Sequence, residues 1–214
     1  MNSSAFPSLL LSFEPGRIFI FFQLLENGFI IKGKVGCSVK EFLCNRMFIE
    51  QEYLDKRIQT IFLNGKPVDD VNSAMVKDGS TISISAAMPG LAGAMMRRGG
   101  ALASMRSGIS YVPAETGSDS YEGKVTIKFF NLISRELGPE FLKRGIIIEG
   151  KTFSGFIGAN RKIIEEGLFS AEKDGVKIET EKLFNIMWQD KSELVLKVTG
   201  KQDNRTMPDT ATLL

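Results

Sequence analysis

Side chains able to act as catalysts or metal ligands are few in this chain and widely spaced. Its 214 residues include no histidine, which removes the usual general base near neutral pH and the commonest nitrogen ligand of metals. The two cysteines, Cys37 and Cys44, fall on one expected helix about 10 Å apart by helical rise, which is too far for a disulfide. We interpret them as small buried thiols of a reduced protein.

Neither the paired carboxylates nor the glycine-rich stretch strengthens the case for an enzyme. Asp69-Asp70 are adjacent on an expected turn and Glu165-Glu166 follow an expected helix, so we interpret both pairs as solvated. The glycines between residues 90 and 100 lack the Gly-Lys-Ser/Thr ending of a phosphate-binding loop. The sequence therefore predicts no catalytic residue, no metal site and no cofactor, and an enzyme of unknown class stays an alternative.

Composition and charge narrow the class of protein. Hydrophobic residues make up 43% and charged residues 24%, which is ordinary for a soluble globular protein. The 27 basic residues are nearly balanced by 25 acidic ones, so the charge does not favour a nucleic-acid partner. The apolar stretch 1–13 has no basic lead-in and is interrupted by Pro7, so we expect neither a signal peptide nor a membrane span. The expected location is the cytoplasm.

An internal repeat carries most of the information about architecture. Three pairs of segments match in the same order, while the spacing between them varies as it does when loops absorb length changes. The pairs are 21–24 with 129–132, 28–34 with 145–151, and 78–84 with 190–196.

The first copy is predicted to contain four strands and one helix. Asn27-Gly28 favours a hairpin between the first two strands, and Ser38 with Glu41 forms a capping box at the start of the helix. The expected strands are 17–25, 29–35, 58–63 and 81–85. This order is that of a β-grasp unit, in which a mixed sheet packs on one helix.

The second copy repeats that order with an inserted helix at Ile133, Leu137 and Phe141. Its expected strands are 125–130, 145–149, 176–180, 183–188 and 193–198. The predicted fold is therefore α+β, with two tandem ubiquitin-like β-grasp domains at 15–90 and 121–200. A Gly/Met/Arg linker at 91–120 joins them, and a flexible tail follows at 201–214. A single continuous α+β sheet is the alternative.

The linker is unusual in charge, because no acidic residue occurs between Gly79 and Ala114. This segment is a tether, a strip that contacts a protein partner, because methionine adapts to irregular surfaces, or a strip that contacts anions through its arginines. The residues of the strip are Met95, Met96, Arg97, Arg98, Met105 and Arg106.

The first copy resembles the sulfur-carrier branch of ubiquitin-like proteins, the small subunit of molybdopterin synthase and the thiamine sulfur carrier. The resemblance rests on residues 36–43, 61–68 and 76–84, and on 125–138 of the second copy. It implies a carrier activated at a terminal Gly-Gly, here Gly99-Gly100. Because Ala101 follows Gly100, that chemistry would first need cleavage. We therefore expect a non-enzymatic interaction module or adaptor, with a sulfur-carrier precursor cleaved after Gly100 as the alternative.

Overall fold

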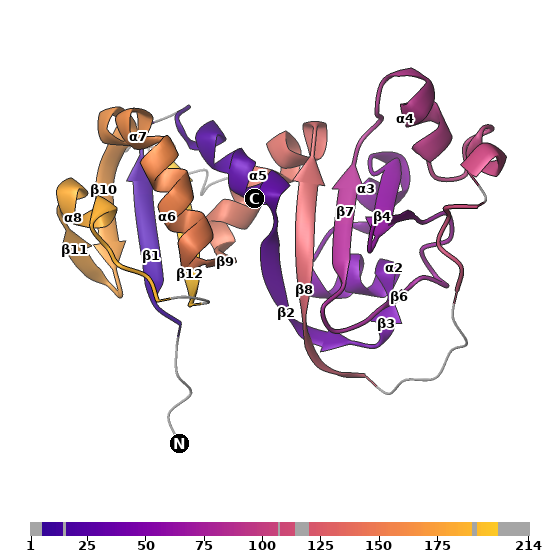
Figure 1. The fold of residues 1–214 in the computed structure, drawn as a ribbon, viewed down its shortest axis with the longest axis horizontal. Coiled ribbons are helices and arrows are strands. Elements are labelled where there is room, and N and C mark those ends of the chain that lie inside the picture. The colour runs from indigo at the N-terminus through magenta and orange to yellow at the C-terminus, as the bar shows by residue number, and fades with distance from the viewer. Residues whose placement is uncertain (1–5, 15, 107, 114–119, 190–191, 201–214) are drawn as a thin grey trace, which may run out of the picture.

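The computed structural model describes residues 6–14, 16–106, 108–113, 120–189 and 192–200, and within them the chain forms one continuous ten-stranded sheet (Figure 1). Its strands lie in the order β11-β10-β1-β12-β9-β2-β8-β7-β4-β5. Two further strands, β3 and β6, form a separate two-stranded sheet. Helices and strands are mixed along the chain, so the predicted α+β class is confirmed.

The bounds of the elements are as follows. The strands are β1 Ser8–Phe13, β2 Phe29–Val35, β3 Cys37–Ser38, β4 Thr60–Leu63, β5 Lys66–Pro67, β6 Met75–Val76, β7 Thr81–Ser85, β8 Tyr121–Phe130, β9 Ile146–Glu149, β10 Leu168–Lys173, β11 Val176–Ile178 and β12 Glu193–Gly200. The α-helices are α1 Phe22–Asn27, α2 Val39–Glu41, α3 Gln51–Lys56, α4 Gly90–Met96, α5 Leu132–Arg144, α6 Gly150–Ala159, α7 Arg161–Gly167 and α8 Thr180–Phe184. Short helical turns are η1 Ile18–Phe21, η2 Phe42–Arg46 and η3 Ala103–Arg106.

The sheet consists of two five-stranded halves with the same pattern of strand directions. In the β2 half, β2-β8-β7-β4-β5, the pair β8/β7 is parallel and the other pairs are antiparallel. In the β9 half, β9-β12-β1-β10-β11, the pair β12/β1 is parallel and the others are antiparallel. The halves join where β2 and β9 run antiparallel, with Ile30 opposite Ile147.

Each half contains a strand from a distant part of the chain. Strand β8 lies between β2 and β7, although both of these precede it by many residues. Strand β1, at the start of the described chain, lies between β12 and β10 near the other end. The hydrogen bonding therefore follows the alternative of one continuous sheet, while the division into domains at 15–90 and 121–200 stays a prediction.

The predicted first strand, 17–25, is wrong. These residues form η1 and most of α1, and the buried side chains among them are Ile20, Phe21, Leu24 and Leu25. That spacing gives one face of a helix, and a nine-residue apolar run is compatible with either structure. The predicted hairpin at Asn27-Gly28 is wrong as well, because Gly28, with a φ of 122°, ends α1 before β2 begins.

The second matched pair of the repeat, 28–34 with 145–151, has the same local structure in both copies at its start. Gly145, with a φ of 106°, ends α5 before β9 in the same way that Gly28 ends α1 before β2. The match of 21–24 with 129–132 does not hold, since the former is helical and the latter ends β8 and starts α5. The counterpart of β8 in the other half is β1, a strand that the sequence did not predict.

Other local predictions have mixed outcomes. The capping box is confirmed, because Ser38 Oγ accepts from the Glu41 amide at 3.1 Å and Glu41 Oε2 accepts from the Ser38 amide at 2.9 Å. The inserted helix is confirmed as α5. The strand predicted at 183–188 is wrong, since α8 ends there and irregular chain follows, while β10 at residues 168–173 was missed. The predicted tail, 201–214, lies outside the described residues.

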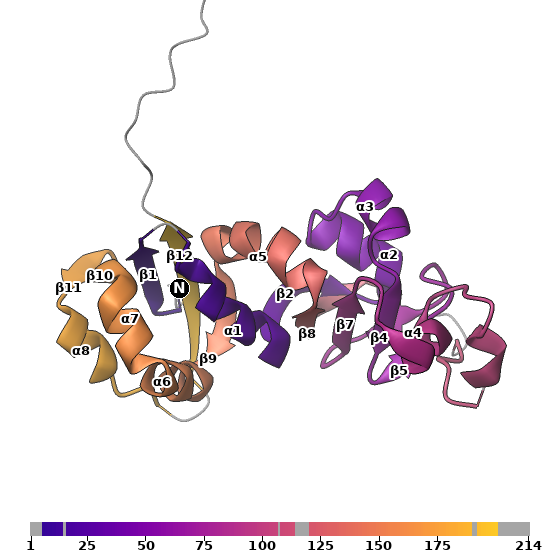
Figure 2. The same cartoon turned by 90° about the horizontal axis from the view of Figure 1, so that it is seen from above.

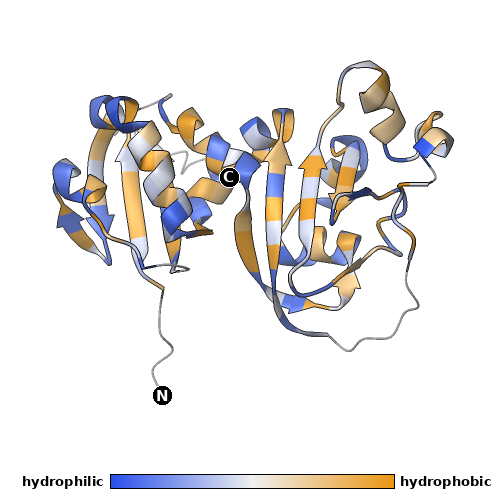
Figure 3. Ribbon diagram, viewed as in Figure 1, coloured by the Kyte–Doolittle hydropathy of each residue, from blue (hydrophilic) through white to orange (hydrophobic). Residues whose placement is uncertain are grey.

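The two halves carry helices on opposite faces (Figure 2). Helices α2 and α3 lie on one side of the β2 half, and α6 lies on the other side of the β9 half. Along β8, hydrophobic and hydrophilic residues alternate (Figure 3). The side chains that point to the core, Val125, Ile127 and Phe129, are fully buried. The ring centroids of Phe129 and Phe141 on α5 lie 4.9 Å apart. The opposite face of the β2 half, called the open face below, carries α4 at its β4/β7 end.

Charged groups bridge the junction between the halves. The Glu193 carboxylate of β12 lies 2.6 Å from the ammonium groups of both Lys32 on β2 and Lys124 on β8. Burial alone would raise the pKa of Glu193, but hydrogen bonds and charge from the two lysines lower it below its usual value.

Within the described ranges, no helix combines the length and the apolar character needed to cross a bilayer.

The position of β1 gives a first prediction. Leu11 is fully buried between β12 and β10, so Leu11→Ala should lower the free energy of unfolding by about 2–5 kcal/mol. Leu91→Ala, at a side chain that is mostly exposed, should change it by less than about 0.5 kcal/mol. Chemical denaturation followed by circular dichroism measures both. Equal, small effects would mean that residues 8–13 do not belong to the sheet.

Candidate functional site

The described residues 90–106 and 108–113, which include most of the predicted linker 91–120, pack against the β4/β5 side of the β2 half. Residues 107 and 114–119 of that linker lie outside the described residues. The Arg98 amide donates to the Gln59 carbonyl at 2.8 Å, directly before β4. Further along, the Tyr111 amide donates to the Pro67 carbonyl of β5 at 2.8 Å, and the Tyr111 hydroxyl accepts from the Met75 amide at 3.3 Å. The segment is thus held to the sheet at both ends.

Arg106 is the main anchor of this segment. Its side chain is fully buried, and all five N–H groups of the guanidinium have acceptors. Two bonds go to the Asp69 carboxylate, at 2.7 and 3.0 Å, in the bidentate geometry that suits arginine. The remaining acceptors are the carbonyls of Met95 and Arg97 and the hydroxyl of Ser110. Arg106 therefore has no donor left for a partner.

Asp69 is exposed, as the sequence predicted, with 42% of its side chain accessible, but its carboxylate is also paired. Its carboxylate receives Arg106 and also the Gly99 amide at 3.1 Å. Partial burial would raise the pKa of Asp69, but the hydrogen bonds from Arg106 and Gly99 and the charge of Arg106 together lower it. Asp70 is exposed as well, and its carboxylate accepts from the Asn72 amide within the turn, as expected.

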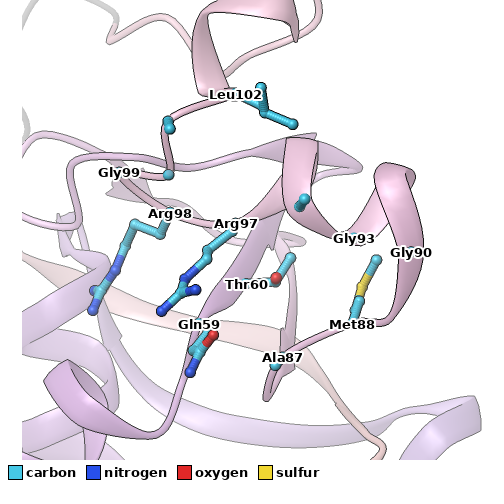
Figure 4. A pocket seen from close by; sticks show the side chains of 13 residues that line it. Gln59, Thr60, Ala87, Met88, Gly90, Gly93, Arg97, Arg98, Gly99 and Leu102 are labelled. Atoms are coloured by element: carbon cyan, nitrogen blue, oxygen red, sulfur yellow. The ribbon is translucent and has the colours of Figure 1, made fainter.

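A pocket of about 560 Å³ lies between β4 and the folded segment (Figure 4). Its lining comes from the start of β4, from the chain that follows β7, and from α4 and the loop after it. The lining residues are Gln59, Thr60, Ala87, Met88, Gly90, Gly93, Ala94, Arg97, Arg98, Gly99, Gly100, Ala101 and Leu102.

Glycine at position 93 is required by this packing. A Cβ there would lie 2.1 Å from the Met88 carbonyl oxygen, so a larger residue would push α4 away from the end of β7.

The predicted contact strip separates into different environments. Arg106 is buried, and Arg98 is mostly covered, donating to the Leu54 carbonyl at 3.1 Å with Asp55 at 3.9 Å. Met95 and Met96 are half-buried, whereas Arg97 and Met105 are exposed. Only part of the strip is therefore presented to solvent.

Gly99 and Gly100, the residues that the resemblance marks as a carrier terminus, lie in the pocket wall. The Gly100 amide donates to the Arg97 carbonyl and the Gly100 carbonyl accepts from the Ala103 amide, at 3.1 and 3.0 Å. A chain cut after Gly100 would also detach β8, which packs between β2 and β7. This geometry lends no support to processing at Gly100.

Sequence reasoning missed Gln59 and Thr60. Thr60 sits two residues before Phe62 on β4, hence on the same side of the strand, facing the open side of the sheet. Thr60 is fully buried, and residues of the segment 90–102 line the pocket on its side of the strand. A local sequence pattern cannot predict this burial, because the residues that line the pocket beside Thr60 come about 30 to 40 positions later in the chain.

A second, apolar depression of about 280 Å³ adjoins the pocket on the open face. Phe62 of β4, Phe130 at the end of β8 and Met88 surround Ser83 of β7. Met88 also lines the larger pocket, so the two hollows share a wall.

The cysteines are not activated. Both are half-buried, and burial raises the pKa of the Cys37 and Cys44 thiols above the ordinary value. Among the described residues, no group of three or more acidic or cysteine side chains is arranged to hold a metal ion.

Comparison of the chain with models of protein families, with curated proteins and with solved structures finds no match.

The Arg106–Asp69 pair gives the second prediction. Asp69→Asn leaves a buried guanidinium without its counter-charge and should lower the free energy of unfolding by about 2 kcal/mol at pH 7. Because the pKa of Asp69 is lowered in the folded state, this contribution is present above the unfolded pKa, near 3.9, and is lost as pH falls through the folded pKa. The difference from the unmodified protein should therefore shrink below about pH 4.

Urea unfolding between neutral and acidic pH measures this difference. Asp70→Asn is the matched control, because its turn needs only an acceptor oxygen, and it should change stability by less than about 0.5 kcal/mol. A deficit that stayed constant from pH 7 to pH 3, or one shared by both variants, would contradict the ion-pair account.

Proposed function

We propose that the protein is a non-enzymatic, ubiquitin-like interaction module that binds a protein partner through the open face of its β2 half. The observation that carries the proposal is the apolar depression formed by Phe62, Met88 and Phe130 on the sheet face opposite α2 and α3, beside the part of that face that α4 covers. An apolar hollow on an otherwise polar face is the usual form of a protein-binding site.

The strand order supports the ubiquitin-like part of the proposal. A β-grasp sheet places its first and last strands side by side and parallel at the centre, with a helix packed on one face. The β2 half has that order if β8 takes the place of the first strand, beside β7, with α2 and η2 following β2. On this view the two sequence copies exchange their first strands, since β1 lies in the β9 half.

The alternative mode of binding for such a module is strand addition at a sheet edge. At the β5 edge, the Pro67 carbonyl already accepts from Tyr111, which occupies that edge. At the other edge, β11 presents Val176, whose side chain is 67% exposed. Face and edge can therefore be tested against each other with one substitution each.

The third prediction concerns this choice. Phe130→Lys places a charge in the depression and should reduce recovery of the partner roughly tenfold or more, as loss of a central aromatic anchor does. Val176→Lys should leave recovery unchanged. Affinity capture of the full-length protein from its native source, with quantitative mass spectrometry, compares the three forms.

Thermal unfolding of each variant serves as the control for folding, since Phe130 is 37% exposed and its replacement should leave the fold intact. If Val176→Lys removed the partner and Phe130→Lys did not, the edge strand and not the open face would be the binding surface. Equal recovery with all three forms would rule out both surfaces.

A further inference from the structure

The larger pocket differs from the apolar depression in its chemistry. Its lining includes two arginines and no acidic residue among the side chains that the structure describes there. The Arg98 guanidinium donates a hydrogen bond to the Leu54 carbonyl and lies near the Asp55 carboxylate. Arg97 is different, because no hydrogen bond or ion pair of its guanidinium is found among the described residues. The pocket thus holds a cation without a counter-charge (Figure 4).

Two oxygen atoms of the same pocket are buried without a hydrogen-bond partner in the described structure. They are Thr60 Oγ1, on a residue with 0% exposure, and Gln59 Oε1. A buried hydroxyl or amide left unpaired costs about 1–3 kcal/mol, and such groups are rare unless something else satisfies them. In Figure 4 the side chains of Arg97, Gln59 and Thr60 gather on one side of the hollow.

We propose that this pocket binds a small organic anion whose carboxylate or phosphate pairs with the Arg97 guanidinium. The Thr60 hydroxyl donates to the same anionic group, and the Gln59 amide binds a polar atom next to it. Arginine suits both kinds of anion because its planar fork matches two oxygens at once.

The rest of the pocket defines the body of the ligand. Met88, Ala94 and Leu102 form an apolar wall opposite the polar side chains. A volume of about 560 Å³ is in the range of small-molecule sites. The ligand class is therefore an anionic head on a short apolar body. This inference does not depend on the protein-binding proposal, because neither Arg97 nor Thr60 lines the depression on the open face.

The fourth prediction uses inorganic phosphate, acetate and hexanoate as probes of the full-length protein. Titrations followed by amide chemical shifts in NMR should show saturable binding of phosphate or of hexanoate at the pocket. Hexanoate should bind more tightly than acetate if the head is a carboxylate, because its chain reaches the apolar wall. Binding of phosphate alone would assign a phosphorylated ligand.

Two variants and one control make the result specific. Arg97→Gln should weaken the binding roughly tenfold or more, the loss expected for a charged hydrogen bond. Thr60→Val should also weaken it while leaving the free protein equally or more stable, because it removes an unpaired buried hydroxyl. Arg46→Gln makes the same charge change at an exposed site on η2 and should bind like the unmodified protein.

The proposal is overturned if none of the three probes gives a saturable shift, or if the shifts persist unchanged in Arg97→Gln. It is also overturned if Arg46→Gln weakens binding as much as Arg97→Gln, which would reveal a general response to net charge. Because Phe130→Lys leaves this pocket intact, loss of the protein partner in that variant and loss of anion binding in Arg97→Gln are separate outcomes.

Discussion

The insertion of β8 between β2 and β7 is the constraint on which the β2 half depends. The strand forms hydrogen bonds on both sides and buries Val125, Ile127 and Phe129, so the sheet would be split in two without it. Its parallel register with β7 also places Phe130 opposite Ser85, at the rim of the apolar depression. Strand β1 has the equivalent central position in the other half. The surface features of the β2 half therefore depend on a central strand that comes from a distant part of the chain.

Two nearby arginines show how the same side chain takes different roles. Arg106 is completely buried, and its hydrogen bonds join the Met95 carbonyl of α4 and the Arg97 carbonyl after it to Asp69 beside the sheet. Arg97 belongs to the same segment, yet its guanidinium faces the pocket with no acidic residue lining it. The Arg106–Asp69 ion pair makes the position of Arg97 possible, because it anchors the segment that carries Arg97 to the same pocket as Thr60. An unanchored glycine-rich segment would lose that arrangement to conformational entropy.

The open face and the pocket meet at Met88, which contributes to both. Their chemistry nevertheless differs, since one hollow is apolar and the other joins a cation to unpaired buried oxygens. An apolar hollow on a sheet gains free energy from any complementary apolar surface, whereas the pocket discriminates by charge and hydrogen bonding. A methionine at the boundary suits both, because its unbranched side chain adapts to either neighbour.

The sequence by itself determined the features that depend on a few neighbouring residues. Ser38 and Glu41 specify a helix start through two local hydrogen bonds, and the strand 81–85 and the inserted helix follow from periodicity. The sequence predicts the strand 29–35 as the return of a hairpin at Asn27-Gly28, and the strand forms although a helix precedes it. Only the tertiary structure decided the rest. The apolar run 17–25 fits a helix or a strand locally, and packing against α5 and β8 selected the helix. The central strand of each half and the carboxylate that pairs with Arg106 are set by contacts between residues far apart in the chain. The free energies of such contacts cannot be derived from local sequence patterns.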